Sequence, residues 1–216
     1  GKKSTPPKKT VSDDYIRLVK RETYLRTDAN SADDIRSMIA LARELDYKLM
    51  LSGVAEGWLT ASNLGEADVP VIITPRNRRS PARGREDSSG SSIETSGILE
   101  RAGVPFAVAA LSSSISLNGL AGRDLTSLPL EAAFAIRGGC SEATALAALT
   151  IVPARLLGLQ DRLGSIEKGK DADLIILDGP PLDYRSYVET AIVSGKVRYD
   201  RVKDHVYPVF DRATLK

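Results

Sequence analysis

Histidine and cysteine are nearly absent from this chain of 216 residues, which contains one of each. The single cysteine, Cys140, excludes an internal disulfide and every metal site built from clustered cysteines. The single histidine, His205, lies in the C-terminal tail, where a lone histidine is more often a surface side chain than a metal ligand. The two residue types together cannot supply the usual ligand set of a zinc site.

An excess of charge of one sign is also missing. The chain has 30 Lys and Arg against 28 Asp and Glu, a formal net charge of +2, which provides no general field for nucleic acid or an anionic membrane. No apolar run approaches the roughly 20 residues that a bilayer-spanning helix needs. We therefore expect a globular protein with either one core or a main domain and a small appendage, and we expect it to bind neither nucleic acid nor membrane.

Strand-like and helix-like segments alternate from residue 12 to residue 111. Apolar, strand-like segments cover residues 23–28, 48–51, 70–74 and 105–111. Amphipathic, helix-like segments cover residues 13–21, 31–45, 58–66 and 92–102. Apolar strands joined by crossover helices are typical of a parallel sheet buried on both faces. Four such units predict part of a doubly wound sheet or part of a (β/α)8 barrel, which four strands cannot close alone.

A second, all-β layer is predicted near the C-terminus. After two further helical segments at 130–137 and 142–149, strand-like segments follow at 173–177, 187–194 and 197–200. The turn Ser194-Gly195-Lys196 separates the last two, and glycine there can adopt a positive φ. We expect these two segments to form a hairpin.

Two polar loops stand out. Residues 76–92 are basic and then rich in serine and glycine, which is typical of a solvated loop. The alternative is an anion or partner contact through its five arginines, although no aromatic residue is interleaved to stack bases; these are Arg76, Arg78, Arg79, Arg83 and Arg85. The serines at 112–114 have no histidine or lysine at a spacing that would activate a nucleophile.

Two C-terminal motifs carry a family resemblance. Residues 148–159 read ALTIVPARLLGL and residues 164–178 read GSIEKGKDADLIILD. They resemble the C-terminal region of the amidohydrolase superfamily, in the branch of imidazolonepropionases and related cyclic amidases. Residues 31–35 (SADDI) and 103–107 (GVPFA) resemble its second half-barrel.

The resemblance implies the C-terminal half of a (β/α)8 barrel followed by part of a small β-sandwich. Residues 1–11 would be a disordered lead-in or linker, 12–163 the half-barrel, and 164–216 the sandwich part with the tail. The family's first half-barrel, with the His-x-His motif of its first strand, is absent from this sequence. We expect an N-terminal half-barrel segment or a second chain to complete the barrel, and hence an oligomer in the latter case, because open strand edges favour association.

The positions that hold the metal in active relatives carry other residues here. Active relatives bind zinc through histidines at the ends of the fifth and sixth strands, and an aspartate at the end of the eighth accepts a proton. By the resemblance, these positions fall on Asp28 (beside Asn30), Gly53 and Leu111. Glycine and leucine cannot ligate, and no acidic residue lies between positions 101 and 123. The resemblance thus implies no catalytic residue, metal ligand or cofactor in this half.

Three functions remain open on this sequence. The first is a catalytically degenerate amidohydrolase-like protein (a pseudoenzyme) with a structural, regulatory or ligand-binding role. The second is a metal-dependent hydrolase of C–N bonds in cyclic amides whose active groups lie in a missing N-terminal half. The third is an assembly subunit that completes a partner chain's barrel.

Overall fold

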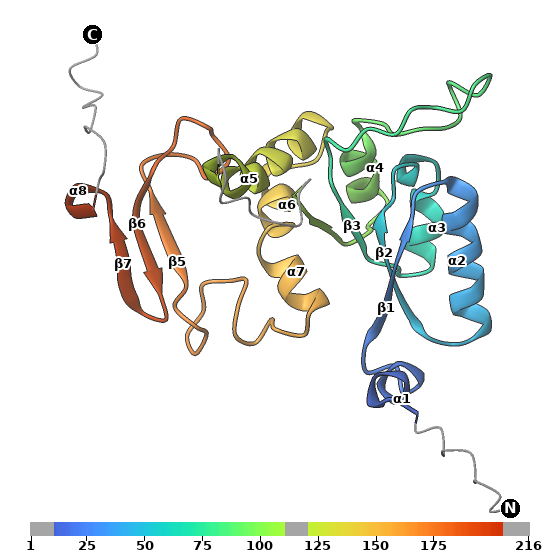
Figure 1. Ribbon diagram of the computed structural model, residues 1–216, viewed down its shortest axis with the longest axis horizontal. Helices are drawn as coiled ribbons and strands as arrows, with labels where there is room; N and C mark the ends of the chain where they lie inside the picture. The colour runs from blue at the N-terminus through green and yellow to red at the C-terminus, as the bar shows by residue number, and fades with distance from the viewer. Residues whose placement is uncertain (1–10, 111–120, 205–216) are drawn as a thin grey trace, which may run out of the picture.

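The computed structural model describes residues 11–110 and 121–204, without the side chains of residues 121–126. These residues form a parallel sheet flanked by helices and a separate antiparallel sheet (Figure 1). Four features singled out from the sequence lie outside the described residues: the lead-in up to residue 10, Leu111, the serines at 112–114, and His205.

The parallel sheet contains four strands, β1 (Tyr24–Ala29), β2 (Lys48–Gly53), β3 (Val71–Ile73) and β4 (Phe106–Val108). Their order in the sheet is β1-β2-β3-β4, and each neighbouring pair is parallel. The prediction of four parallel strands is therefore confirmed. This sequential order is that of a singly wound arrangement, because a doubly wound sheet reverses its strand order at a switch point.

Helices connect the strands and pack on one face of the sheet. They are α2 (Ala32–Glu44), the 3-10 turn η1 (Gly57–Leu59), α3 (Ala61–Glu66) and α4 (Thr95–Arg101). Ser31 caps α2, since its hydroxyl accepts a hydrogen bond from the N–H of Asp34 at 3.1 Å. Ile35, Leu64 and Leu99, one from each α-helix, are completely buried in a single core cluster with strand side chains.

Strand periodicity divides the side chains between two environments. Leu49 and Leu51 of β2 belong to the helix-facing core, whereas the alternate residue Ser52 does not, because successive side chains point to opposite faces. On β1 the face opposite the helices carries two charged residues, Arg26 and Asp28, whose side chains are 60% and 71% exposed. The face of β1 that no helix covers is therefore charged. A strand that lines the packed interior of a barrel would instead present apolar side chains on that face.

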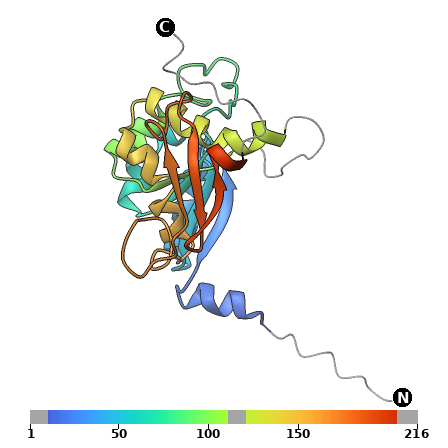
Figure 2. The same ribbon diagram turned by 90° about the vertical axis from the view of Figure 1, so that its left-hand side faces the viewer.

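The C-terminal part consists of helices followed by the antiparallel sheet. The helices are α5 (Ala121–Arg137), α6 (Glu142–Ala147) and α7 (Ile151–Leu156). The strands β5 (Leu174–Leu177), β6 (Val188–Val193) and β7 (Lys196–Asp200) pair in this order, and Figure 2 shows this sheet face-on. Short helices α1 (Asp13–Val19) and α8 (Arg201–Asp204) complete the described chain.

The predicted hairpin between β6 and β7 is confirmed. Val193 pairs with Lys196, and the two residues between them, Ser194 and Gly195, have φ of 51° and 73°. Positive φ at both central positions is the geometry of a two-residue hairpin turn whose twist matches its strands.

Three predicted helices differ from the structure. The helix expected over 130–137 is longer, because α5 already begins at Ala121. The helix expected over residues 58–66 is divided into η1 and α3, because Thr60 between them has a non-helical φ of −127°. The helix expected over 142–149 ends at Ala147, and Thr150, with φ −125° and ψ −87°, separates it from α7. Among the residues that the structure describes, no helix has the length and hydropathy to cross a bilayer.

Candidate functional site

The candidate site lies where the parallel strands β1 and β2 end. In the register of the two strands, Asp28 is paired with Ser52 and Ala29 with Gly53. Because the carboxyl ends of parallel strands meet at one edge of the sheet, Asp28, Asn30 and Gly53 lie close together there. The fourth predicted position, Leu111, cannot be placed because it lies outside the described residues.

Asp28 is held by two neighbours on the face opposite the helices. Its carboxylate accepts a hydrogen bond from the Ser52 hydroxyl, and Arg26 Nη2 lies 3.7 Å from Asp28 Oδ1. Arg26 Nε also donates to Ser52 Oγ at 3.3 Å. The carboxylate is thus hydrogen-bonded and partly neutralised, with a guanidinium where a bound cation would have to approach it.

Gly53 provides no side chain that could ligate a metal, and the amide of Asn30 lies against it. Its φ is +85°, a conformation that L-residues adopt at a cost. A Cβ built there would lie 2.5 Å from Asn30 Oδ1. That same oxygen faces the N–H of Ala55 at 3.4 Å. The amide of Asn30 therefore fills the space from which a side chain at position 53 would start.

The described residues do not fit a catalytic zinc site. Such a site takes three protein ligands from histidine, cysteine or carboxylate groups, and here only Asp28 offers a charged donor. Within residues 11–110 and 121–204, no three His, Cys, Asp or Glu side chains are grouped so that they could hold a metal ion.

Glu56 is a buried carboxylate that was not singled out from the sequence. It connects the chain segments that follow β1 and β3. Glu56 is 6% exposed and accepts two backbone hydrogen bonds at 2.8 Å, from Ala32 N at the start of α2 and from Gly90 N. The indole of Trp58 also donates to Gly90 O at 2.9 Å. Glu56 therefore ties the N-terminus of α2, which favours negative charge, to the loop after β3.

A second buried carboxylate, Glu131 of α5, fixes the other end of this loop. It is 0% exposed and accepts hydrogen bonds from Arg76 N at 2.9 Å and from Arg76 Nε at 2.8 Å. The Arg76 guanidinium also lies 5.7 Å from the centroid of the Phe134 ring. Arg76, predicted as one of five arginines for an anion or partner, is therefore engaged inside the fold.

The sequence carried signals for these missed residues. Arg26 lies two positions before Asp28, and residues spaced by two share a face of a strand. Glu131 directly precedes the buried Ala132 and lies four positions before the buried Ala135, so it stands on an apolar helix face. A charge in such a position indicates a buried ion pair. Glu56 had no comparable signal, because its partners are backbone groups far along the chain.

Cys140 is a buried thiol of low reactivity. Burial first, and then the negative charge of Glu100, raise its pKa to about 11. Glu100 accepts hydrogen bonds from the hydroxyls of Ser141 and Thr144, each at 2.6 Å, and these lower the pKa of Glu100. The hydrogen bonds of Glu100 connect the start of α6 to α4. We therefore interpret Cys140 and its surroundings as a structural contact.

An apolar cleft of about 770 Å³ separates α7 from the antiparallel sheet. Leu157 and Ile166 on its walls are 69% and 86% exposed, and Ile175 of the edge strand β5 is 61% exposed. Large exposed apolar surface beside an open strand edge is typical of a contact surface.

A parallel sheet in sequential strand order, with helices between its strands and an antiparallel sheet appended, is an arrangement compatible with the α/β-barrel class of proteins. The model of the amidohydrolase family matches residues 21–206. The chain belongs to the amidohydrolase family.

Individual relatives agree with this assignment. An amidohydrolase from Thermotoga maritima MSB8 superposes with a TM-score of 0.72 and 32% identity, over 86% of this chain and 46% of that one. Imidazolonepropionase from Porphyromonas gingivalis is 39% identical over 80 residues, 34% of this chain and 19% of the relative. N-acetylglucosamine-6-phosphate deacetylase from Bos taurus is 50% identical over 59 residues, 27% of this chain and 13% of the relative. The chain thus spans about half of the solved structure and a smaller share of these curated relatives.

Proposed function

We propose that this chain is the catalytically degenerate C-terminal half of an amidohydrolase barrel, with a structural, regulatory or ligand-binding role. The observation that carries the proposal is the polar network at the end of strands β1 and β2, where Gly53 offers no donor atom and the amide of Asn30 lies against it. The Asp28 carboxylate is meanwhile engaged by Ser52 and Arg26, so this end of the sheet presents a polar network in place of a metal site.

The proposal includes a partner that completes the barrel. Three observations support it: the chain spans 46% of the Thermotoga maritima structure, β1 is a largely exposed edge strand of the sheet, and the apolar cleft at α7 is uncovered. An N-terminal half-barrel segment of a longer chain would account for all three observations. A second chain of the same shape would account for them equally well.

A hydrolase with its active groups in an N-terminal half is the second candidate. It is favoured by the names of the relatives, a deacetylase and imidazolonepropionases, and by the carboxylate that Asp28 offers where active relatives have a histidine. The two candidates differ in whether the completed barrel holds a metal ion.

Elemental analysis of the chain purified without chelator together with an N-terminal half-barrel segment, joined with amidase assays, distinguishes the two candidates. We expect less than about 0.1 equivalent of zinc and no hydrolysis of cyclic amides, because this half contributes at most one carboxylate to a metal site. Glu44→Ala, which removes an exposed carboxylate at the opposite end of α2, is the matched control for Asp28→Ala. About one equivalent of zinc, with activity lost in Asp28→Ala and kept in Glu44→Ala, would overturn the proposal.

A further inference from the structure

The loop between β3 and α4 forms a projecting arm, which we call the arginine arm and define as residues 76–92. In Figure 1 it extends away from the body beyond the end of β3. Its two ends are fastened to buried carboxylates, Arg76 to Glu131 and Gly90 to Glu56. The arm therefore leaves and re-enters the fold at two defined points.

Internal hydrogen bonds hold the two sides of the arm together. Arg79 N donates to Ser91 Oγ at 3.0 Å, and Ser91 N donates to Arg79 O at 3.1 Å. Nearer the tip, Ala82 N donates to the buried Ser89 Oγ at 2.8 Å. Gly90 has φ +84°, and a Cβ there would lie 2.8 Å from Pro81 N, so only glycine allows this close approach of the two sides.

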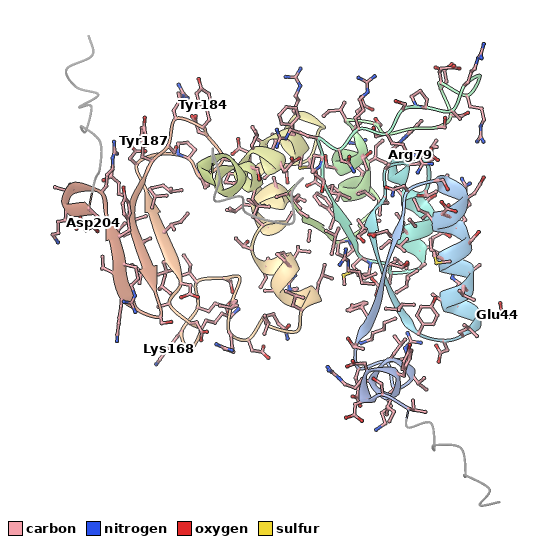
Figure 3. All side chains as sticks on the ribbon, viewed as in Figure 1. Glu44, Arg79, Lys168, Tyr184, Tyr187 and Asp204 are labelled. Carbon is pink, nitrogen blue, oxygen red and sulfur yellow. The ribbon has the colours of Figure 1, made fainter. Side chains whose placement is uncertain are left out.

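Four guanidinium groups on this arm are exposed, those of Arg78, Arg79, Arg83 and Arg85; Figure 3 labels Arg79. Among the described residues, none of the four forms a side-chain hydrogen bond or ion pair, whereas Arg76 at the base does. Two carboxylates, Glu86 and Asp87, lie near the tip. Glu86 accepts a hydrogen bond from Gly84 N, which lowers its pKa and keeps it ionised.

We propose that the arginine arm is a docking surface for an acidic segment of a partner protein. A guanidinium is a planar fork that binds a carboxylate through two parallel hydrogen bonds. Four guanidinium groups on an arm that is held by internal hydrogen bonds lose less conformational entropy on binding than they would on a mobile chain. The inference is independent of the proposed loss of the metal site, because the arm's guanidinium groups make no contact with Asp28.

A short acidic peptide fits the arm better than a nucleic acid does. Residues 76–92 contain no aromatic side chain on which bases could stack. The start of α2, tied to the base of the arm through Glu56, presents the exposed acidic residues Asp33 and Asp34. A long polyanion extending past the arm would meet this negative charge, and the chain as a whole has a net charge of only +2.

Fluorescence anisotropy with a labelled hexaglutamate peptide tests the proposal on the full chain, with labelled hexalysine and oligo-dT as comparison probes. The arm variant replaces four arginines by glutamine: Arg78→Gln, Arg79→Gln, Arg83→Gln and Arg85→Gln. The matched control removes the same charge from four exposed arginines elsewhere: Arg17→Gln, Arg43→Gln, Arg155→Gln and Arg198→Gln. Circular dichroism checks that both variants fold.

We expect hexaglutamate to bind the wild-type chain and the control variant alike, and to bind the arm variant at least about tenfold more weakly. Binding should weaken between about 0.05 M and about 0.3 M NaCl, because the contacts are exposed. If the arm variant does not fold, Arg83→Gln with Arg85→Gln near the tip is measured instead. Equal loss in both variants, no binding by the wild-type chain, or tighter binding of oligo-dT than of hexaglutamate would overturn the proposal.

Discussion

The hydroxyl of Ser52 on β2 donates a hydrogen bond to the carboxylate of Asp28, its register partner on β1. The link joins two adjacent strands where each approaches its carboxyl end, on the face that carries the candidate site. Arg26 contacts both residues. Three polar side chains thus satisfy one another at a position where a metal centre would require free donors.

Placing even a methyl group at position 53 should destabilise the fold. In Gly53→Ala the backbone must keep φ +85°, and the Asn30 side chain must move away from a Cβ only 2.5 Å from its Oδ1. We expect a loss of about 1–3 kcal/mol of unfolding free energy. Gly84→Ala is the control, since Gly84 has φ +77° but no atom within 4 Å of its Cβ, and should cost only about 1 kcal/mol. Urea unfolding measures both, and equal losses would show that Asn30 does not fill the site.

Breaking the buried pair of Arg76 and Glu131 should have unequal effects from its two ends. Arg76→Ala leaves a carboxylate that is 0% exposed without its counter-charge, whereas Glu131→Gln leaves a guanidinium that is 26% exposed and can reach water. We expect Arg76→Ala to lower the free energy of unfolding by roughly 3–4 kcal/mol and Glu131→Gln to lower it by roughly 2–3 kcal/mol. The control Arg79→Ala should change the free energy of unfolding by less than about 0.5 kcal/mol. The reverse order for the first two variants would contradict the asymmetry.

Glu56→Ala should loosen the base of the arginine arm. The substitution removes the acceptor of two backbone hydrogen bonds, to Ala32 and Gly90, and should lower the unfolding free energy by about 1–3 kcal/mol. Limited trypsin digestion should cut faster after the arginines of the arm, because local opening becomes easier. Glu66→Ala, at an exposed helix end, serves as the control. Unchanged cleavage in Glu56→Ala would show that the arm is held by its own hydrogen bonds alone.

Cys140 should respond to pH in a defined direction. Its folded pKa of about 11 lies above the ordinary value of 9.0, so the thiol contributes stability that is complete below pH 9 and is lost as the pH rises toward 11. A disulfide-exchange reagent at pH 8 should react slowly with folded protein and quickly in denaturant. Cys140→Ala should reduce the fall in stability between pH 9 and pH 11, and the same slope in both proteins would refute the assignment.

The chain on its own should not persist as an isolated compact monomer. It exposes the sheet edge at β1 and an apolar cleft at α7, and such surfaces favour association. Multi-angle light scattering on purified chain should give a mass above 23.2 kDa, or a stable complex when an N-terminal half-barrel segment is supplied. A stable 23.2 kDa monomer over a wide concentration range would contradict the proposed partner.

The order of elements could be predicted because it depends on local and periodic features. Apolar runs at strand length, the cap at Ser31 and the glycine at 195 act over a few neighbouring residues. The four parallel strands and the hairpin could be predicted from these local features. The division of helices at Thr60 and Thr150 could not be predicted, because it depends on individual backbone angles that several residue types can adopt.

By itself, the sequence determined the α/β order, the absence of clustered histidine and cysteine, and the positions of Asp28, Asn30 and Gly53 at strand ends. Only the tertiary structure decided how these positions are used. The Asn30 amide against Gly53, the Ser52 hydroxyl on Asp28, and the carboxylates of Glu56 and Glu131 at the two ends of the arm all join residues that are distant in sequence. Their pairing depends on strand register and helix docking, which distribute charge and space in three dimensions and leave little trace in a linear pattern.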